Sequence, residues 1–299
     1  MRALSTSRPP PPEPGWSSAV VERVVDVGAV RRILFRADAD FSFAAGQWVD
    51  LEVCSAPDLP LGGFSPISAD AALTAASLGG GSASAAVIAA ARAAALPLFE
   101  LAVRRGRHPT TAHLHSPALE PGSSRVFVRT GGRFHEPLRA ALAEPGARPR
   151  CLAFFAGGVG AAPLLSMLLS AASSPPGGSV VFCYTARTRA DLVFAEELRA
   201  LARLLGPRRL LLFLSVSREA GDGEALPEQP WSPGEHVNAG RPSRERVLAA
   251  LALGERACGD SPGGARAPTL AFVCGPPAYT DAVVGFADGA AALHFERWW

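Results

Sequence analysis

One stretch of this chain constrains its fold more than any other: residues 152–168, which read LAFFAGGVGAAPLLSML. The five apolar residues at its start predict a strand buried on both faces, as in the centre of a parallel sheet. Pro163 suits the first turn of a following helix, because proline lacks an N–H group and has a preset φ. Between strand and helix, glycines permit a tight turn and let the backbone approach a ligand. They are Gly157, Gly158 and Gly160.

A helix that begins after this turn directs free N–H groups and the positive end of its dipole at whatever lies over the turn. The stretch therefore predicts a site for an anion such as a pyrophosphate. The residues expected to form it are Gly157, Gly158, Val159, Gly160, Ala161 and Pro163. The same pattern also occurs as plain packing, so the interpretation depends on the rest of the chain.

Composition narrows the class of protein. The 299 residues are enough for about two domains. A net charge of +2 without a basic run argues against nucleic acid as a partner. All 29 basic residues are arginine, which excludes a phosphate loop ending in Gly-Lys and also Schiff-base chemistry.

Cysteine usage and hydropathy indicate the kind of cellular compartment in which the protein would work. The cysteines are odd in number and lack the spacing of a metal or redox pair, which indicates a reducing environment. They are Cys54, Cys151, Cys183, Cys258 and Cys274. No run of about 18 apolar residues occurs, so no membrane span is predicted.

Residues 1–18 predict a disordered segment that could serve in targeting. They contain Arg2, Arg8 and a single acid, Glu13. A mitochondrial presequence shares this Arg and Ser content, but it is also an amphipathic helix, which the prolines after Arg8 would interrupt. Mitochondrial and cytoplasmic locations both stay open.

The first half of the chain has the pattern of short strands. Apolar and polar residues alternate over 47–53, 99–104 and 125–129, and shorter β-branched runs occur at 20–25 and 33–35. These segments predict a small antiparallel barrel over residues 19–148. An Ala/Gly/Ser-rich tract at 69–97 is expected to be a low-complexity insertion.

Two segments of this half contain residues that could bind a ligand. Residues 62–68, GGFSPIS, place small residues beside one aromatic and a hydroxyl, which suits a flat ring; a tight turn beside an edge strand is the alternative. In the second segment, Thr110 can cap a short helix whose N-terminus offers N–H groups to phosphate. His113 and His115 are two apart and would face different ways on that helix, so no metal site is predicted.

Residues 144–149 are rich in proline and glycine and predict a domain boundary. Beyond them, apolar strands at 152–156, 180–184, 210–216 and 270–274 alternate with helical patterns, which predicts a doubly wound parallel sheet over 149–299. Asp191 is expected to cap the helix over 192–205, and residues 217–242 are expected to form a loop. Ligands of such sheets bind at the carboxyl ends of the strands. Besides the glycine turn, we expect Thr185, Arg187, Ser217, Arg218, Cys274, Gly275, Pro276 and Pro277 to gather there.

Three motifs in this order resemble the ferredoxin–NADP reductase superfamily. Residues 156–163 resemble its pyrophosphate loop, residues 184–191 a second nucleotide-contacting loop, and residues 273–277 the loop under the nicotinamide. Within the superfamily, residues 43–50, 62–65 and 295–299 look most like the branch of oxidoreductase NAD-binding domain-containing proteins. The resemblance implies a flavin-binding-type barrel followed by an NAD(P)-binding domain, with FAD and NAD(P)H as cofactors.

The resemblance also implies roles for particular residues. Flavin-binding members carry Arg-x-Tyr-Ser where this chain has Gly62, Gly63, Phe64 and Ser65. Phe64 can stack on the flavin and Ser65 can hydrogen-bond it. The missing arginine removes a contact of about 1.5–3 kcal/mol, or about one to two decades in affinity. The candidates that would compensate are Thr110 and Thr111, on the helix over 110–114, and Arg104, Arg105 or Arg107.

Near the carboxyl terminus, Trp299 matches the aromatic residue that shields the flavin ring, and Glu296 lies close enough to orient or relay a proton. Cys274 is expected near the reacting carbon of the nicotinamide. The alternative for the terminal segment is a strand that docks its tryptophans between the domains. These residues predict an oxidoreductase that passes a hydride from NAD(P)H to FAD and electrons to an unidentified acceptor. A nucleotide-binding sensor or scaffold with little turnover is the alternative function.

Overall fold

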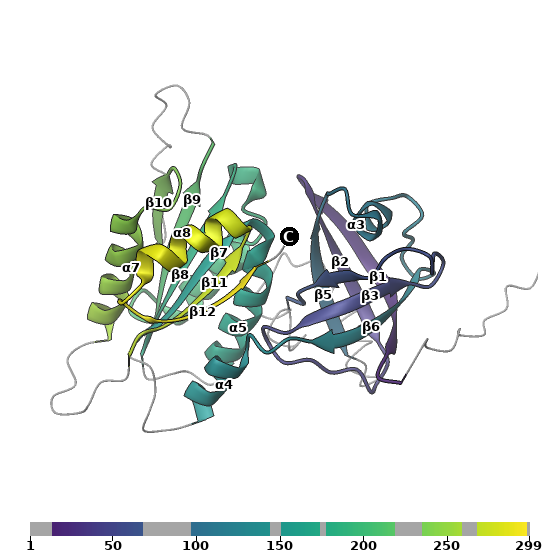
Figure 1. The fold of residues 1–299 in the computed structure, drawn as a ribbon, viewed down its shortest axis with the longest axis horizontal. Coiled ribbons are helices and arrows are strands. Elements are labelled where there is room, and N and C mark those ends of the chain that lie inside the picture. Colours follow the sequence, from purple (N-terminus) through teal and green to yellow (C-terminus); the bar gives the residue numbers. More distant parts are fainter. Residues whose placement is uncertain are drawn as a thin grey trace, which may run out of the picture.

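The computed structural model of the chain describes residues 14–67, 97–143, 151–173, 178–218, 235–258 and 268–297. They form two domains side by side, each built on a six-stranded sheet (Figure 1). The predicted fold class is confirmed. The predicted segment 1–18, the insertion 69–97 and the boundary 144–149 lie largely outside the described residues. Within 1–18, however, strand β1 begins at Ser17, two residues before the expected start of the first domain.

The first sheet is antiparallel throughout, in the order β4-β3-β6-β1-β2-β5. Its strands are β1 (Ser17–Val27), β2 (Val30–Ala37), β3 (Trp48–Val53), β4 (Gly62–Phe64), β5 (Leu98–Arg104) and β6 (Arg125–Gly131). Alternate residues point inward, as at Val49, Leu51 and Val53 of β3. Among the described residues one bridge, between Pro66 and Leu101, joins the two edges, so the sheet is barrel-like but not closed by a continuous ladder.

The second sheet is parallel throughout, in the order β10-β9-β8-β7-β11-β12. Its strands are β7 (Cys151–Gly157), β8 (Ser179–Ala186), β9 (Leu210–Val216), β10 (Glu235–Ala239), β11 (Leu270–Gly275) and β12 (Ala292–Arg297). Neighbouring residues of β7 enter different cores because their side chains point to opposite faces of the sheet: Phe154 packs in one cluster and Phe155 in the other.

Helices cover both faces of this sheet, as doubly wound folds require. Helices α5 (Ala161–Ser173) and α6 (Ala195–Leu205) share the core of Phe154, on the side that faces the first domain (Figure 1). Helices α7 (Arg244–Ala257) and α8 (Pro277–Ala287) share the core of Phe155. None of the described helices is long and apolar enough to cross a membrane.

Three predictions about local structure failed. Asp191 does not cap the helix after β8: α6 begins at Ala195 with Phe194 as its cap, and Asp191 ends a 3-10 turn in which it accepts a hydrogen bond from Thr188. Strand β10 lies in a segment that the sequence indicates as a loop. Helix α4 (Glu136–Ala143) was likewise not predicted.

A buried ionic triad and apolar contacts join the two domains. Arg32 of β2 forms ion pairs with Glu100 of β5 and with Glu197 of α6, and all three side chains are buried. The two carboxylates outweigh the desolvation of the guanidinium and raise the pKa of Arg32 further. Nearby, the ring of Phe134 packs against that of Phe272, with 5.6 Å between centroids. The domains therefore share buried ionic and aromatic contacts, and one hydrophobic cluster contains residues of both, such as Val30 and Phe182.

Candidate functional site

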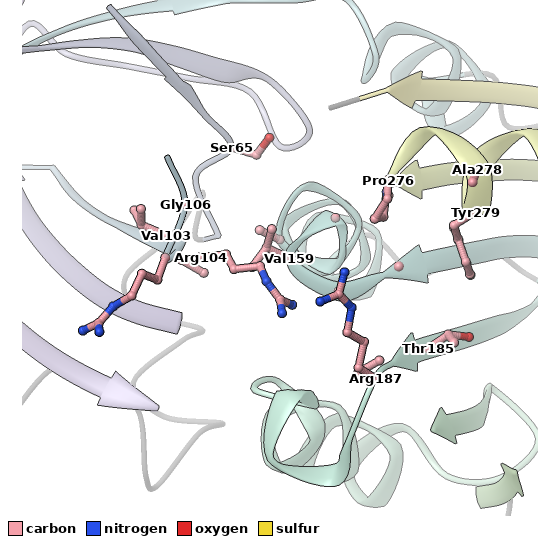
Figure 2. Close-up of a pocket in the computed structure, with 18 of the residues that line it drawn as sticks. Ser65, Val103, Arg104, Gly106, Val159, Thr185, Arg187, Pro276, Ala278 and Tyr279 are labelled. Atoms are coloured by element: carbon pink, nitrogen blue, oxygen red, sulfur yellow. The ribbon is translucent and has the colours of Figure 1, made fainter. Parts of the chain in front are cut away.

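A cavity of about 680 Å³ opens where the two domains meet at the carboxyl edge of the parallel sheet (Figure 2). The second domain lines it with the ends of β7, β8, β9 and β11, and the first with the ends of β4 and β5 and the residues that follow them. Its volume lies in the ordinary range of ligand sites. Strand ends that are far apart in the chain therefore line the same cavity, as predicted for a doubly wound sheet.

The glycine turn, residues 157–160, forms the floor of the cavity, and only Val159 contributes a side chain to it. Strand β7 ends at Gly157, a 3-10 turn covers Gly158–Gly160, and α5 follows directly. Gly158 has φ +57°, which side chains rarely adopt. A Cβ on Gly160 would lie 2.5 Å from the carbonyl oxygen of Cys274 in the neighbouring strand β11. Only glycine fits between these two backbones.

Tyr279, which the sequence analysis missed, covers this floor. Its ring would lie 2.8 Å from a Cβ on Gly157 and 2.9 Å from one on Gly275. Tyr279 lies in the first turn of α8 and lines the cavity. Desolvation raises the pKa of its hydroxyl group, so it stays protonated near neutral pH. The sequence offers one sign of this role: Tyr279 lies three residues after Pro276, which was predicted to lie at the site.

The charge that lines the cavity has one sign. No aspartate or glutamate is among the described lining residues, whereas five arginines are: Arg104, Arg105, Arg107, Arg187 and Arg241. They come from both domains, and Figure 2 shows Arg104 on the side of the first domain and Arg187 on that of the second. Asp191 lies 4.0 Å from Arg104. This lining suits an anionic ligand.

The wall from the first domain consists of side chains. Phe64 and Ser65 follow one another at the end of β4, and both line the cavity. The Oγ atom of Ser65 is buried and has no hydrogen-bond partner among the described residues. A buried hydroxyl group without a partner is costly, which indicates a place for a ligand atom.

The structure brings most of the predicted residues together. The lining includes Phe64, Ser65, Thr111, Gly157, Gly158, Val159, Gly160, Thr185, Arg187, Ser217, Gly275 and Pro276. Those that it does not bring to the cavity are Thr110, Ala161, Pro163, Arg218, Cys274 and Pro277. Ala161 and Pro163 pack under the floor, and Cys274 is fully buried in the core shared with α5, because its side chain points to the covered face of β11. Arg218 and Pro277 are exposed outside the lining.

Thr110 has a different role from the one expected. Helix α3 (Pro109–Leu114) has His108 as its cap, so the prediction that Thr110 caps it is wrong. Pro109 occupies the first helical position, which places Thr110 inside the first turn. Its side chain is fully buried, and its hydroxyl group donates a hydrogen bond to the carbonyl oxygen of Pro60. Thr110 thereby joins α3 to the segment before β4.

Glu296 lies on the edge strand β12, in register with Cys274 of β11. Its Oε2 atom is buried and has no hydrogen-bond partner among the described residues. Burial raises the pKa of this carboxyl group to about 7. Glu296 does not line the cavity in this structure, and Trp299 lies outside the described residues. No cluster of metal-ligating side chains occurs in the described part of the chain.

Fold and cavity together describe a two-domain chain with one arginine-lined ligand cavity between an antiparallel barrel-like sheet and a doubly wound parallel sheet. Residues 154–226 match the oxidoreductase NAD-binding domain family. Over the whole chain, oxidoreductase NAD-binding domain-containing protein 1 of Bos taurus is 28% identical over 288 residues, which cover 91% of this chain and 76% of that protein. Ferredoxin–NADP reductase B of Sorangium cellulosum is 32% identical over 192 residues, 63% of this chain and 64% of that protein.

Solved structures show the same fold at lower identity. A ferredoxin NADP+ reductase from Neisseria gonorrhoeae with bound FAD and NADP superposes with a TM-score of 0.62 at 14% identity, covering 95% of this chain and 99% of that one. The resemblance to the ferredoxin–NADP reductase superfamily, and to its branch of oxidoreductase NAD-binding domain-containing proteins, is confirmed.

Proposed function

We propose that this chain is an NAD(P)H-dependent flavin oxidoreductase that passes a hydride from NAD(P)H to FAD and electrons on to an acceptor that its sequence does not name. One observation carries the proposal: a single cavity joins the glycine floor of one domain to Phe64 and Ser65 of the other. A nicotinamide and a flavin that each bind one domain would meet in this space. The similarity to reductases supports the same activity.

The residues present fit both cofactors. Ser65 offers an unpartnered hydroxyl group, the glycine floor excludes a Cβ, and the lining arginines complement phosphates. A bound flavin supplies the redox chemistry, since its ring accepts a hydride at N5. The chain supplies position: Gly160 admits a pyrophosphate to the start of α5, and Arg104 and Arg187 neutralise its charge from two sides.

Glu296 is proposed to hold a proton near the reacting rings. With a pKa of about 7, its carboxyl group is close to half protonated under physiological conditions, which is the range in which a group can both donate and accept. Its register with Cys274 places it at the carboxyl edge of the sheet, next to the strand end that reaches the cavity through Gly275. Trp299, three residues later, is proposed to shield the flavin.

We propose NADPH as the better donor. Ser217 and Arg241 line the cavity beyond Arg187, and no described lining residue is acidic. A carboxylate that bound the ribose 2′-hydroxyl would mark an NADH site, whereas arginine accommodates a 2′-phosphate. Arg218, which the sequence places at the same edge of the sheet, is exposed outside the lining.

A visible absorption spectrum tests the function directly. The purified chain, incubated with FAD and then freed of excess cofactor, is expected to keep flavin bands that bleach when NADPH is added without oxygen. Bound flavin that no dinucleotide reduces would contradict the proposed activity. The test also separates NADPH from NADH by the rate of bleaching.

The second candidate is a nucleotide-binding sensor or scaffold without turnover. Gly62 favours it, since an arginine there would contribute a phosphate contact. In that case the chain binds dinucleotide, detected by calorimetry, but retains no flavin.

A further inference from the structure

Two cysteines that are far apart in the chain contact the same serine at the amino edge of the parallel sheet. Cys258 follows directly after α7, and its thiol group donates a hydrogen bond of 3.3 Å to the Oγ atom of Ser179. The backbone N–H group of Ser179 donates in turn to the Sγ atom of Cys258, at 3.0 Å. Cys151, the first residue of β7, also hydrogen-bonds the side chain of Ser179. The two sulfur atoms therefore flank one hydroxyl group.

Sheet register and a glycine bring the two thiols together. Cys151 and Ser179 are register partners in the neighbouring strands β7 and β8, whose backbones lie about 4.8 Å apart. On α7, Gly254 lies one turn before Cys258, so both residues are on the same face of the helix. A Cβ on Gly254 would lie 2.5 Å from the Sγ atom of Cys151. The helix can therefore approach Cys151 closely because residue 254 has no side chain.

The two thiols differ in their access to solvent. Cys258 is partly exposed, whereas Cys151 is fully buried. Burial raises the pKa of Cys151 to about 12, and the hydrogen bond to Ser179 lowers it only in part. A small oxidant from solvent therefore reaches Cys258 first, and Cys151 reacts with a sulfur atom that is held beside it.

We propose that Cys151 and Cys258 form a redox modification site, which hydrogen peroxide converts to a disulfide. The sulfur of Cys258 attacks the peroxide, the O–O bond breaks, and Cys258 becomes a sulfenic acid while one water molecule leaves. The sulfur of Cys151 then attacks that of Cys258. The S–S bond forms, and the sulfenic hydroxyl group leaves with the thiol proton of Cys151 as a second water molecule. A thiol reductant reverses the reaction by exchange.

The cross-link would join two elements that support the cavity at their other ends. Strand β7 leads into the glycine turn at residues 157–160, and Arg241, which lines the cavity, lies shortly before α7. The hydroxyl group of Ser179 stays satisfied after the bond forms, because it also donates to the carbonyl oxygen of Gly254. Neither thiol lines the cavity, so the inference does not depend on the proposed function.

Peptide mass spectrometry tests the proposal on the full chain. The reduced protein is freed of reductant, treated with hydrogen peroxide, alkylated and digested with trypsin. We expect the number of alkylated thiols to fall by two and the peptides 151–187 and 257–266 to be joined until dithiothreitol separates them. The first peptide also contains Cys183, so fragmentation spectra of the joined peptides locate the bond.

Variants confirm the assignment. Cys151→Ser and Cys258→Ser should abolish the link, and Cys183→Ser should keep it. Cys54→Ser is the matched control: Cys54 is partly exposed as well, and burial raises its pKa to about 11. This variant should form the disulfide to the same extent as the wild-type chain.

Three results would overturn the proposal: a bond from Cys258 to Cys183, Cys258 oxidised to sulfinic acid while Cys151 is still alkylated, or both peptides recovered alkylated and unlinked. Wild-type protein gives each of these results, so they do not depend on whether a serine variant folds. A chain that forms the disulfide but whose flavin is not reduced by NADPH would support this site and contradict the proposed reductase activity.

Discussion

The two walls of the cavity use glycine in opposite ways. At Gly160 an added Cβ would meet the backbone of Cys274, which cannot move without breaking the sheet. At Gly62 it would meet the end of the Phe64 side chain, which can rotate away. The floor in the second domain is therefore defined by backbone, whereas the wall in the first domain is defined by a side chain. A backbone site tolerates no substitution, and a side-chain site can change its ligand preference by a few mutations.

The largest expected effect concerns the buried ion pairs that join the two domains. Arg32→Met leaves the buried carboxylates of Glu100 and Glu197 without their cation. The free energy of unfolding should fall by about 3–5 kcal/mol, measured in urea. Arg133→Met removes an ion pair with Glu136 in which the arginine is 84% exposed, so the free energy of unfolding should change far less than in Arg32→Met. If the free energy of unfolding fell equally in the two variants, the buried position of the Arg32 ion pairs would not account for their effect.

The next effect tests the backbone floor. Gly160→Ala forces a methyl group against the Cys274 carbonyl and should cost about 1–3 kcal/mol of stability, with loss of NADPH binding in calorimetry. Gly285→Ala adds the same atom where nothing lies within 4 Å, and should be neutral or stabilising by up to about 1 kcal/mol. If Gly160→Ala binds NADPH normally, the floor is not the nucleotide site.

A smaller effect depends on pH. The pKa of Glu296 is raised from 4.5 to about 7, so between these values the folded chain holds a proton that the unfolded chain has released. Its contribution to stability is therefore present below pH 4.5 and lost as pH rises toward 7. Allowing for solvent access, the free energy of unfolding of the wild-type chain should fall by about 1–2 kcal/mol between pH 5 and pH 8 because of Glu296. Glu296→Gln should remove this fall, as measured by urea unfolding at the two pH values. An identical pH dependence in both proteins would refute the raised pKa.

The smallest effect sharpens the view of the side-chain wall. Ser65→Ala removes a buried oxygen that has no partner among the described residues, so stability should not fall. Flavin affinity should nevertheless decrease by about three- to tenfold, read from fluorescence quenching. A variant that loses stability but keeps its affinity would show that Ser65 is structural.

Prediction from sequence succeeded where local pattern and backbone geometry decide the outcome. The run before Gly157 is apolar at every position, which identifies a central strand, and the glycines after it identify the turn. Cys274 was expected in the cavity but lies in the core. A strand that is apolar at every position does not show which side chains point to which face of the sheet. Thr110 was misassigned as a cap because its helix begins earlier, at Pro109, and its side chain is bonded to the distant Pro60. Asp191 was misassigned because α6 begins only at Ala195.

The sequence by itself determined the two-domain order, the parallel sheet and the glycine floor, because hydrophobic periodicity and the conformational freedom of glycine are local properties. Only the tertiary structure decided that Phe64 covers Gly62, that Tyr279 covers Gly157, and that Arg32 meets Glu197 across the domains. These contacts join residues whose spacing in the chain carries no information about their approach. Their geometry exists only after both cores have packed.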